Sequence, residues 1–206
     1  MKDPDILVAI EPVAEAFEKL GIHYFIGGSV ASSAYGIARS TMDVDMVSDL
    51  KTKHVQSLVR MLESSYYIDA DMILDAIRRC SSFNIIHLDT MLKIDVFITK
   101  NAPYNIEALK RRRKDTLDED HRAIEFFLAS PEDVILSKLA WFLLGGGVSD
   151  RQWSDVLGVL KVQKDSLDKE YLKHWASDLE VKDLLEKAFK DAGIDNAPET
   201  LTEYSI

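Results

Sequence analysis

Apolar side chains recur along the chain at two spacings, one typical of helices and one typical of strands. Over residues 4–20 they return every three or four positions, which predicts an amphipathic helix that ends at Gly21. Residues 23–26 are a short run rich in aromatic and β-branched side chains, and residues 43–47 alternate between acidic and apolar positions. Both segments are therefore predicted to be strands.

The middle of the chain continues this alternation of helices and strands. Two helical patterns are followed by a pair of apolar runs separated by a turn at Asp89-Thr90, which predicts a β-hairpin, and one more apolar run follows. The predicted helices cover residues 51–64 and 71–79, and the predicted strands cover residues 83–88, 92–98 and 123–129.

Residues 130–206 carry only helical patterns. Ser130-Pro131 followed by two acidic residues is a strong helix start, because serine caps the first turn and proline suits its first position. Two further amphipathic helices are predicted over residues 168–192. The expected fold is therefore mixed α/β (α+β), with a mixed sheet in residues 1–129 and a helical C-terminal region in residues 130–206.

Composition limits the class of protein. The 206 residues are 47% hydrophobic and 29% charged, an ordinary balance for a globular chain, and the single cysteine excludes an internal disulfide framework. No apolar stretch approaches the roughly 18 residues of a membrane span, and no signal-peptide pattern opens the chain. We therefore expect a cytoplasmic protein with no membrane partner.

The net charge of −10 disfavours general affinity for nucleic acids, which requires clustered Lys and Arg side chains. A local basic groove remains compatible with this charge. Residues 110–114 are a basic run, and acidic residues follow it. We expect this run to be a solvated helix end and turn, and contact with phosphates is the alternative.

The chemistry concentrates in residues 27–45. Gly27-Gly28 forms a turn, and Ser29 is predicted to cap the helix that follows; such a turn lets backbone N–H groups approach an anion. On the next strand, Asp43 and Asp45 point to the same face because side chains alternate. Their repulsion would be relieved by Mg²⁺, which binds one or two carboxylates together with substrate phosphates. The pair of features predicts a metal–nucleotide site.

Other charged residues extend this prediction. Arg39 lies close to Thr41, and guanidinium groups bind phosphate oxygens in bidentate fashion; the alternative is a solvated loop arginine. Asp95 is the single carboxylate within an apolar strand, so it requires a metal or a cationic partner such as Lys93. Lys138 lies among apolar positions of a helix and requires a carboxylate or phosphate unless its stem covers apolar surface and its ammonium reaches water.

Gly27-Gly28-Ser29, followed by Arg39, Thr41, Asp43 and Asp45, resembles the signature of the nucleotidyltransferase superfamily, which has the DNA polymerase β-like fold. The ending Arg-x-Thr-x-Asp-x-Asp is most similar to minimal nucleotidyltransferases of the abortive-infection toxin type, AbiEii. This resemblance implies a nucleotidyltransferase palm in residues 1–129. It also implies that Asp95 is the third aspartate of a metal triad with Asp43 and Asp45.

The resemblance continues more weakly into the helical region. The segment ending at Lys138 is similar to the third motif of the toxin-type enzymes, Leu-x-x-Lys. Their last motif, Arg-x-Lys-Asp-x-x-Asp, is present only in part, because Ser154-Asp155 stands where Lys-Asp is expected and Gly158 replaces the final aspartate. Spacing alone predicts that Arg151 and Asp155 form an exposed i,i+4 ion pair.

The implied activity is transfer of a nucleoside monophosphate from an NTP to an acceptor hydroxyl with Mg²⁺ as cofactor. In this mechanism Asp43 and Asp45 hold the metal, Gly28 and Ser29 seat the phosphates, and Asp95 binds a second metal or deprotonates the hydroxyl. Three functions remain open: modification of RNA or a protein by a toxin with an antitoxin partner, adenylylation of a small molecule such as an aminoglycoside, and a catalytically silent binding module.

Overall fold

The computed structural model describes residues 4–116 and 125–194, which form a mixed sheet with helices on both faces. The order of strands across the sheet is β3-β4-β5-β2-β1-β7-β6. The strands are β1 (Tyr24–Ile26), β2 (Asp43–Ser48), β3 (Tyr66–Tyr67), β4 (Ser82–His87), β5 (Lys93–Ile98), β6 (Arg113–Thr116) and β7 (Glu125–Leu128).

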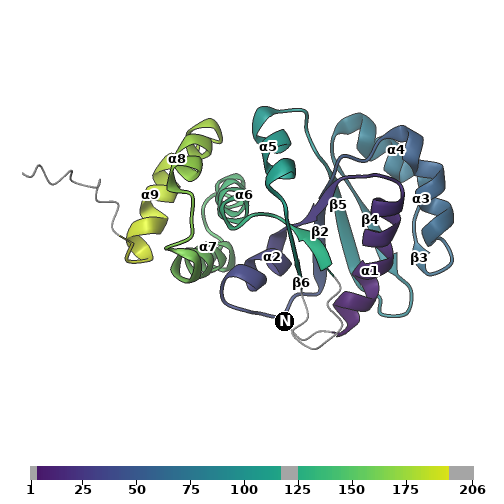
Figure 1. Ribbon diagram of the computed structural model, residues 1–206, viewed down its shortest axis with the longest axis horizontal. Coiled ribbons are helices and arrows are strands. Elements are labelled where there is room, and N and C mark those ends of the chain that lie inside the picture. The colour runs from purple at the N-terminus through teal and green to yellow at the C-terminus, as the bar shows by residue number, and fades with distance from the viewer. Residues whose placement is uncertain (1–3, 117–124, 195–206) are drawn as a thin grey trace, which may run out of the picture.

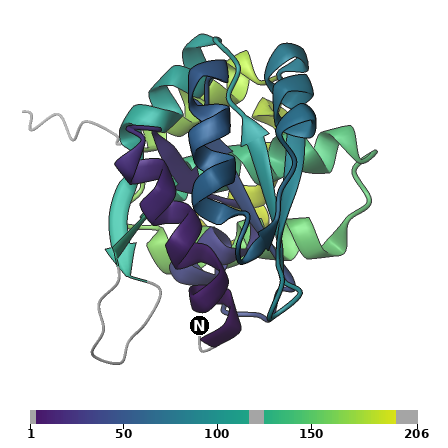
Figure 2. The same ribbon diagram turned by 90° about the vertical axis from the view of Figure 1, so that its right-hand side faces the viewer.

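The helices form two groups, one on each side of the sheet. In Figure 1 α1, α3 and α4 lie on one side and α6–α9 on the other, and Figure 2 shows the first group in front of the sheet. The helices are α1 (Pro4–Lys19), α2 (Gly28–Tyr35), α3 (Val55–Leu62), α4 (Ala70–Arg79), α5 (Pro103–Arg111), α6 (Pro131–Leu144), α7 (Asp150–Gln163), α8 (Lys169–Asp178) and α9 (Lys182–Asp191), with a 3-10 turn η1 (Thr52–His54) before α3.

The centre of the sheet has two different faces because side chains alternate along β2 and β5. The apolar positions of these strands, such as Val44 and Val96, are completely buried in the main hydrophobic core. The polar positions, which include Asp45 and Asp95, lie on the opposite face, toward α2 and α6. The sheet therefore separates an apolar layer from a layer that carries the charged residues.

Most predicted elements are confirmed, and residues 130–194 contain helices and the turns that connect them, with no strand, as expected. The predicted hairpin is the antiparallel pair of β4 and β5. Ser130 caps α6 as predicted, because its hydroxyl accepts a hydrogen bond from the Asp133 N–H. Part of the strand predicted over residues 123–129 lies outside the described residues, and the remainder is β7.

Three local predictions were wrong in whole or in part. The side chain of Ser29 does not cap α2, because the helix already begins at Gly28. The basic run is a helix end, as predicted, because Lys110 and Arg111 lie in the last turn of α5, but no turn follows: residues 113–116 form strand β6, paired with β7. The short strand β3 was also missed, since two residues carry no detectable period. In both cases pairing with a neighbouring strand determines the structure.

Among the described helices, none is long and apolar enough to cross a membrane.

Candidate active site

The Gly27-Gly28 turn lies directly against β2. The N–H of Gly27 donates a hydrogen bond to the carbonyl oxygen of Asp45 at 2.8 Å. Gly28 has a φ of +54°, and a Cβ atom at this position would overlap the carboxylate of Asp45. Glycine is therefore required here both for the backbone conformation and for the close approach of the carboxylate.

Asp45 lies at the centre of an acidic cluster. Parallel pairing of β2 and β5 places Asp45 opposite Asp95, and Asp43 precedes Asp45 by two residues on the same face. Burial raises the pKa of the Asp45 carboxyl, and the nearby charges of Asp43 and Asp95 raise it further. Among the described residues, none forms a hydrogen bond or an ion pair with this carboxylate. Asp45 is thus held in an unfavourable electrostatic environment.

The other two aspartates have protein partners. Thr41 donates its hydroxyl to Asp43 Oδ1 at 2.8 Å, which leaves the rest of this exposed carboxylate open to solvent. Lys93 Nζ lies 2.6 Å from Asp95 Oδ2, and Asn84 donates its side-chain amide to the other oxygen. The hydrogen bond to Asp95 raises the pKa of Lys93. The cationic partner considered for Asp95 from the sequence is therefore Lys93.

A second cluster brings together Arg39, which was predicted to bind phosphate, and Lys138, which was predicted to need a carboxylate or a phosphate. Asp155 of α7 accepts hydrogen bonds from Arg39 Nε and Nη2, both at 3.0 Å, and from Lys138 Nζ at 2.7 Å. Arg39 also donates to the hydroxyl of Ser29. Burial alone would raise the pKa of Asp155, but the hydrogen bonds from Arg39 and Lys138 outweigh burial and lower it. Asp155 thus links the phosphate turn to α6.

This arrangement corrects the prediction that Arg151 and Asp155 form an exposed pair. The side chain of Asp155 is only 6% exposed, because α7 packs against α2 and α6 and turns this position inward. The partial match to the Lys-Asp of the toxin-type motif was the one sequence signal that could have identified it. At Gly158, a Cβ atom would fall 3.3 Å from the N of Ile37, so the aspartate of that motif has little room here.

The donor set fits a divalent cation that is shared with substrate phosphates. Within residues 4–116 and 125–194, no three His, Cys, Asp or Glu side chains gather as a ready-made metal site. Asp43 and Asp45 nevertheless supply two neighbouring carboxylates, and a cation beside Asp45 would relieve the repulsion that raises its pKa. Two carboxylates plus phosphates are a usual ligand set for Mg²⁺.

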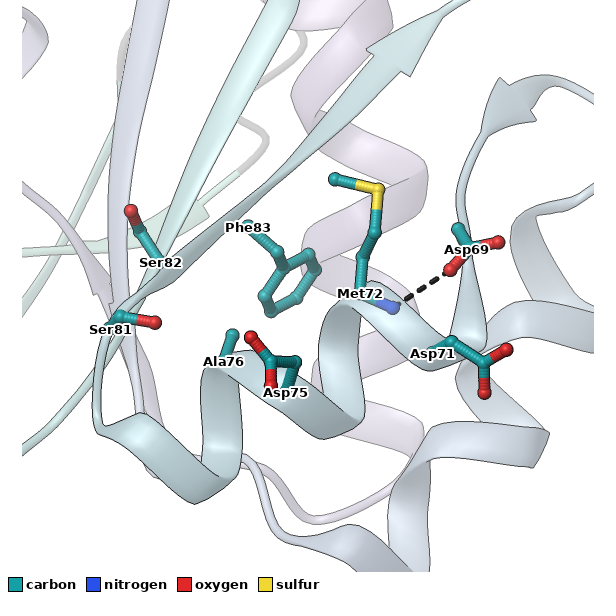
Figure 3. Close-up of a pocket in the computed structure, with 8 residues that line it drawn as sticks. All are labelled: Asp69, Asp71, Met72, Asp75, Ala76, Ser81, Ser82 and Phe83. Atoms are coloured by element: carbon teal, nitrogen blue, oxygen red, sulfur yellow. Dashed lines mark hydrogen bonds between the residues drawn. The ribbon is translucent and has the colours of Figure 1, made fainter.

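A separate hollow lies away from these residues, between α4 and the start of β4 (Figure 3). Three aspartates line it, Asp69, Asp71 and Asp75, and two of them have partners within the protein. Asp69 accepts a hydrogen bond from the Met72 N–H at the start of α4, and Asp75 pairs with Arg78 and Arg79. None of the predicted site residues lines this hollow.

Comparison with known proteins identifies the fold. No family model and no curated protein matches the sequence. Among solved structures, the antibiotic-resistance factor ANT(2'')-Ia in complex with adenylyl-2''-tobramycin is similar with a TM-score of 0.56 and 13% identity, over 85% of this chain and 97% of that chain.

An antigenic nucleotidyltransferase-like protein from Paracoccidioides brasiliensis gives a TM-score of 0.54 and 16% identity, over 91% of this chain and 93% of that chain. A solution structure of ANT(2'')-Ia gives the same score, with 13% identity over 93% and 97% of the two chains. At this level of identity the similarity concerns the arrangement of helices and strands. The chain therefore shares the fold of ANT(2'')-Ia and of this nucleotidyltransferase-like protein.

Proposed function

We propose that this protein is a Mg²⁺-dependent nucleotidyltransferase that moves a nucleoside monophosphate from an NTP to an acceptor hydroxyl. The observation that carries the proposal is the position of Asp45. Its carboxylate packs against the Gly28 turn on one side, faces Asp95 on the other, and lacks a partner among the described residues. A metal-bound triphosphate would supply the missing positive charge and occupy the turn at the same time.

Different residues around Asp45 would bind the phosphates and the Mg²⁺ ion. The backbone N–H groups of Gly28 and Ser29 would receive the β and γ phosphates, with Arg39 beside the Ser29 hydroxyl, while the N–H of Gly27 stays bonded to Asp45 and holds the turn against β2. Asp43 and Asp45 would hold Mg²⁺, with Thr41 orienting Asp43 through its hydrogen bond. When bound, Mg²⁺ neutralises charge on the phosphates and polarises the reacting phosphoryl group.

Lys138 and Asp95 complete the proposed site. Lys138 of α6 is held by Asp155 of α7, and its charge opposes part of the rise in the pKa of the Asp45 carboxyl. Its ammonium would therefore lie close enough to Asp45 to contact the phosphates of a bound NTP. Asp95 lies on the neighbouring strand, where its carboxylate could accept a proton from the attacking hydroxyl once Lys93 shifts to a phosphate. In-line attack at the α-phosphorus then expels pyrophosphate, and positioning supplies most of the catalysis.

The experiment that tests this proposal follows the label from α-phosphate-labelled NTPs. Purified protein, Mg²⁺ and each NTP in turn are incubated with a cell lysate, and the lysate is then separated into RNA, protein and small molecules. We expect label in one fraction, and none with Asp45→Asn. Failure of every NTP to bind or react, in a protein whose thermal unfolding shows it to be folded, contradicts the proposal.

Adenylylation of a small hydroxylated molecule is the second candidate. The specific observation in its favour is the similarity to ANT(2'')-Ia over nearly the whole of that chain, including a complex with adenylyl-2''-tobramycin. Acquired aminoglycoside resistance on expression would support this function. Growth arrest would instead support the toxin role implied by the sequence resemblance, with an antitoxin as partner. NTP binding without transfer to any fraction would leave the silent binding module.

A further inference from the structure

An exposed aromatic side chain borders the proposed site on the side of β5. Trp141 of α6 is 53% exposed, which is unusual for so large an apolar ring. Its ring meets the ring of Phe97 on β5 edge to face, with the centroids 6.1 Å apart and the planes at 63°. Phe97 therefore supports Trp141 from beneath, and the remaining surface of Trp141 faces solvent.

Both aromatic residues lie next to residues of the proposed site. Phe97 follows Asp95 by two positions on the same face of β5, a step of about 7 Å along the strand. Trp141 follows Lys138 by three positions on α6, so the two side chains lie on neighbouring parts of one helix face. Phe97 and Trp141 thus form an aromatic surface beside Asp95 and Lys138, which we call the shelf.

The geometry of the transfer determines whether the NTP or the acceptor contacts the shelf. An in-line displacement places the attacking oxygen and the leaving pyrophosphate on opposite sides of the α-phosphorus. The pyrophosphate side is fixed by the turn at Gly28, which packs against Asp45 from the direction of β1. The attacking hydroxyl therefore approaches from the direction of β5, where Asp95 and Phe97 lie.

We propose that Trp141, supported by Phe97, is the surface on which the acceptor stacks, and that the acceptor carries a planar unsaturated ring close to its reactive hydroxyl, as a nucleoside does. This inference rests on the proposed function. In the transfer, the acceptor oxygen forms a bond to the α-phosphorus, and the bond between that phosphorus and the bridging oxygen breaks. Pyrophosphate leaves with the electron pair, and the hydroxyl proton passes to Asp95 and then to water.

The test measures acceptor binding separately from transfer. The protein is saturated with Mg²⁺ and an NTP analogue whose α,β-bridge is a methylene group, so that the donor position is filled and no reaction occurs. The four nucleosides and, as a saturated-ring control, tobramycin are then titrated by calorimetry. We expect a nucleoside to bind, and Trp141→Ala to weaken it by roughly tenfold, the scale of one lost base–aromatic stack.

Two further variants test whether a loss of nucleoside affinity depends on the aromatic ring at position 141. Trp141→Phe should retain most of the affinity because it keeps an aromatic face. Leu144→Ala removes a side chain that is 78% exposed on the same helix and should change nothing. The affinity for the NTP analogue should be the same in all variants, because the donor phosphates bind at the turn of α2.

Three outcomes would overturn the inference. If Trp141→Ala weakens the NTP analogue as much as the nucleoside, the shelf holds the donor base. If tobramycin binds wild-type protein and no nucleoside does, the acceptor has no planar ring. If nucleosides bind equally well to Trp141→Ala, the shelf is not their site. Should the analogue itself fail to bind, the proposed function fails, and the same nucleoside titrations without it still decide whether Trp141 binds a planar ring.

Discussion

Two groups of carboxylates lie in similarly crowded surroundings but differ in how they are neutralised. In the first turn of α6, Glu132 and Asp133 are only 1% and 2% exposed, yet both have partners within the protein. On β2, Asp45 is partly buried beside two other acids and has no partner among the described residues. A buried charge without a partner is costly, so an acid left in this state points to a ligand from outside.

The partners of the α6 acids come from several elements. Glu132 Oε1 accepts a hydrogen bond from the Asp168 N–H at 2.9 Å, and Oε2 lies 3.3 Å from Arg111 Nη2. Asp133 accepts from the hydroxyls of Ser130 and Tyr171. These contacts join α5, α6 and the start of α8. Protein groups therefore neutralise the α6 acids, in contrast to Asp45, although Glu132 Oε2 is paired with Arg111 and Arg113 by charge and accepts no hydrogen bond among the described residues.

The largest effect is expected for Asp45→Asn, which should lower kcat/KM for transfer by about a thousandfold through loss of a metal ligand. It should not lower stability. The raised pKa of Asp45 means that folding stability falls as the pH rises from 3.8, the usual pKa of an aspartate, through the folded pKa, so the ionised carboxylate is unfavourable at pH 7.

Thermal unfolding of both proteins at pH 7 checks this second expectation. Without Mg²⁺ the Tm of Asp45→Asn should equal or exceed that of the wild type. Addition of Mg²⁺ and an NTP should raise the wild-type Tm and leave the variant nearly unchanged. A large loss of Tm in the variant would mean that Asp45 has a protein partner and belongs with the α6 acids.

Asp155→Asn should affect both stability and NTP binding, because Asp155 is a buried acid with protein partners and also contacts the proposed site. It is a buried acid with complete partners, but those partners are Arg39 and Lys138 of the proposed site. Removal of its charge leaves Lys138 buried and unneutralised, which should cost about 3 kcal/mol and lower the Tm by roughly 6–12 °C. The KM for the NTP should rise by about tenfold, with a smaller change in kcat.

The pH dependence distinguishes this ion pairing from simple packing. Because the pKa of Asp155 is lowered in the folded state, the stability that its charge contributes is complete above 3.8, the usual pKa of an aspartate, and disappears as the pH falls through the folded pKa. The difference in denaturant unfolding between wild type and Asp155→Asn should therefore be full at pH 7 and become smaller as the pH is lowered below 3.8. A difference that stays constant over this pH range would show that shape, and not charge, is what the substitution disturbs.

The difference between local spacing and long-range packing explains which features could be predicted from the sequence. The strands, the turn and the shared face of Asp43 and Asp45 follow from local spacing, which a strand or helix enforces by its own geometry. The contact between Arg39 and Asp155 joins positions 116 residues apart. Helix packing alone brings them together, so Asp155 appeared from the sequence to be a surface residue. The strand β6 was missed for the same reason, since its pairing with β7 is not encoded in its charged side chains.

Glu132→Gln tests the two buried acids of α6, Glu132 and Asp133, separately from the proposed site. The substitution keeps the shape and the hydrogen bond from Asp168 N–H but removes the charge that faces Arg111. Because the Arg111 side chain remains 26% exposed, we expect a moderate loss of about 2 kcal/mol, equivalent to roughly 4–8 °C in Tm. NTP affinity should not change. Glu170→Gln, in an exposed pair with Lys173, is the matched control and should be nearly neutral.

Tyr171→Phe is the smallest and most selective change around the α6 acids. It removes the hydroxyl that donates to Asp133 at 2.8 Å but keeps the ring that the Arg111 guanidinium covers at 3.9 Å. The free energy of unfolding should fall by about 1 kcal/mol, or roughly 2–4 °C in Tm.

The pH dependence of this loss follows from the pKa of Asp133. Burial raises the pKa of Asp133 and the hydrogen bond from Tyr171 opposes the rise, so removal of this bond should raise that pKa further. The deficit should therefore shrink in acid, where Asp133 is protonated in both proteins, because a hydrogen bond to a carboxylate is stronger than one to a neutral acid. Denaturant unfolding across this pH range measures the effect, and a deficit that stays constant from neutral pH into acid would show that Asp133 is not ionised at neutral pH.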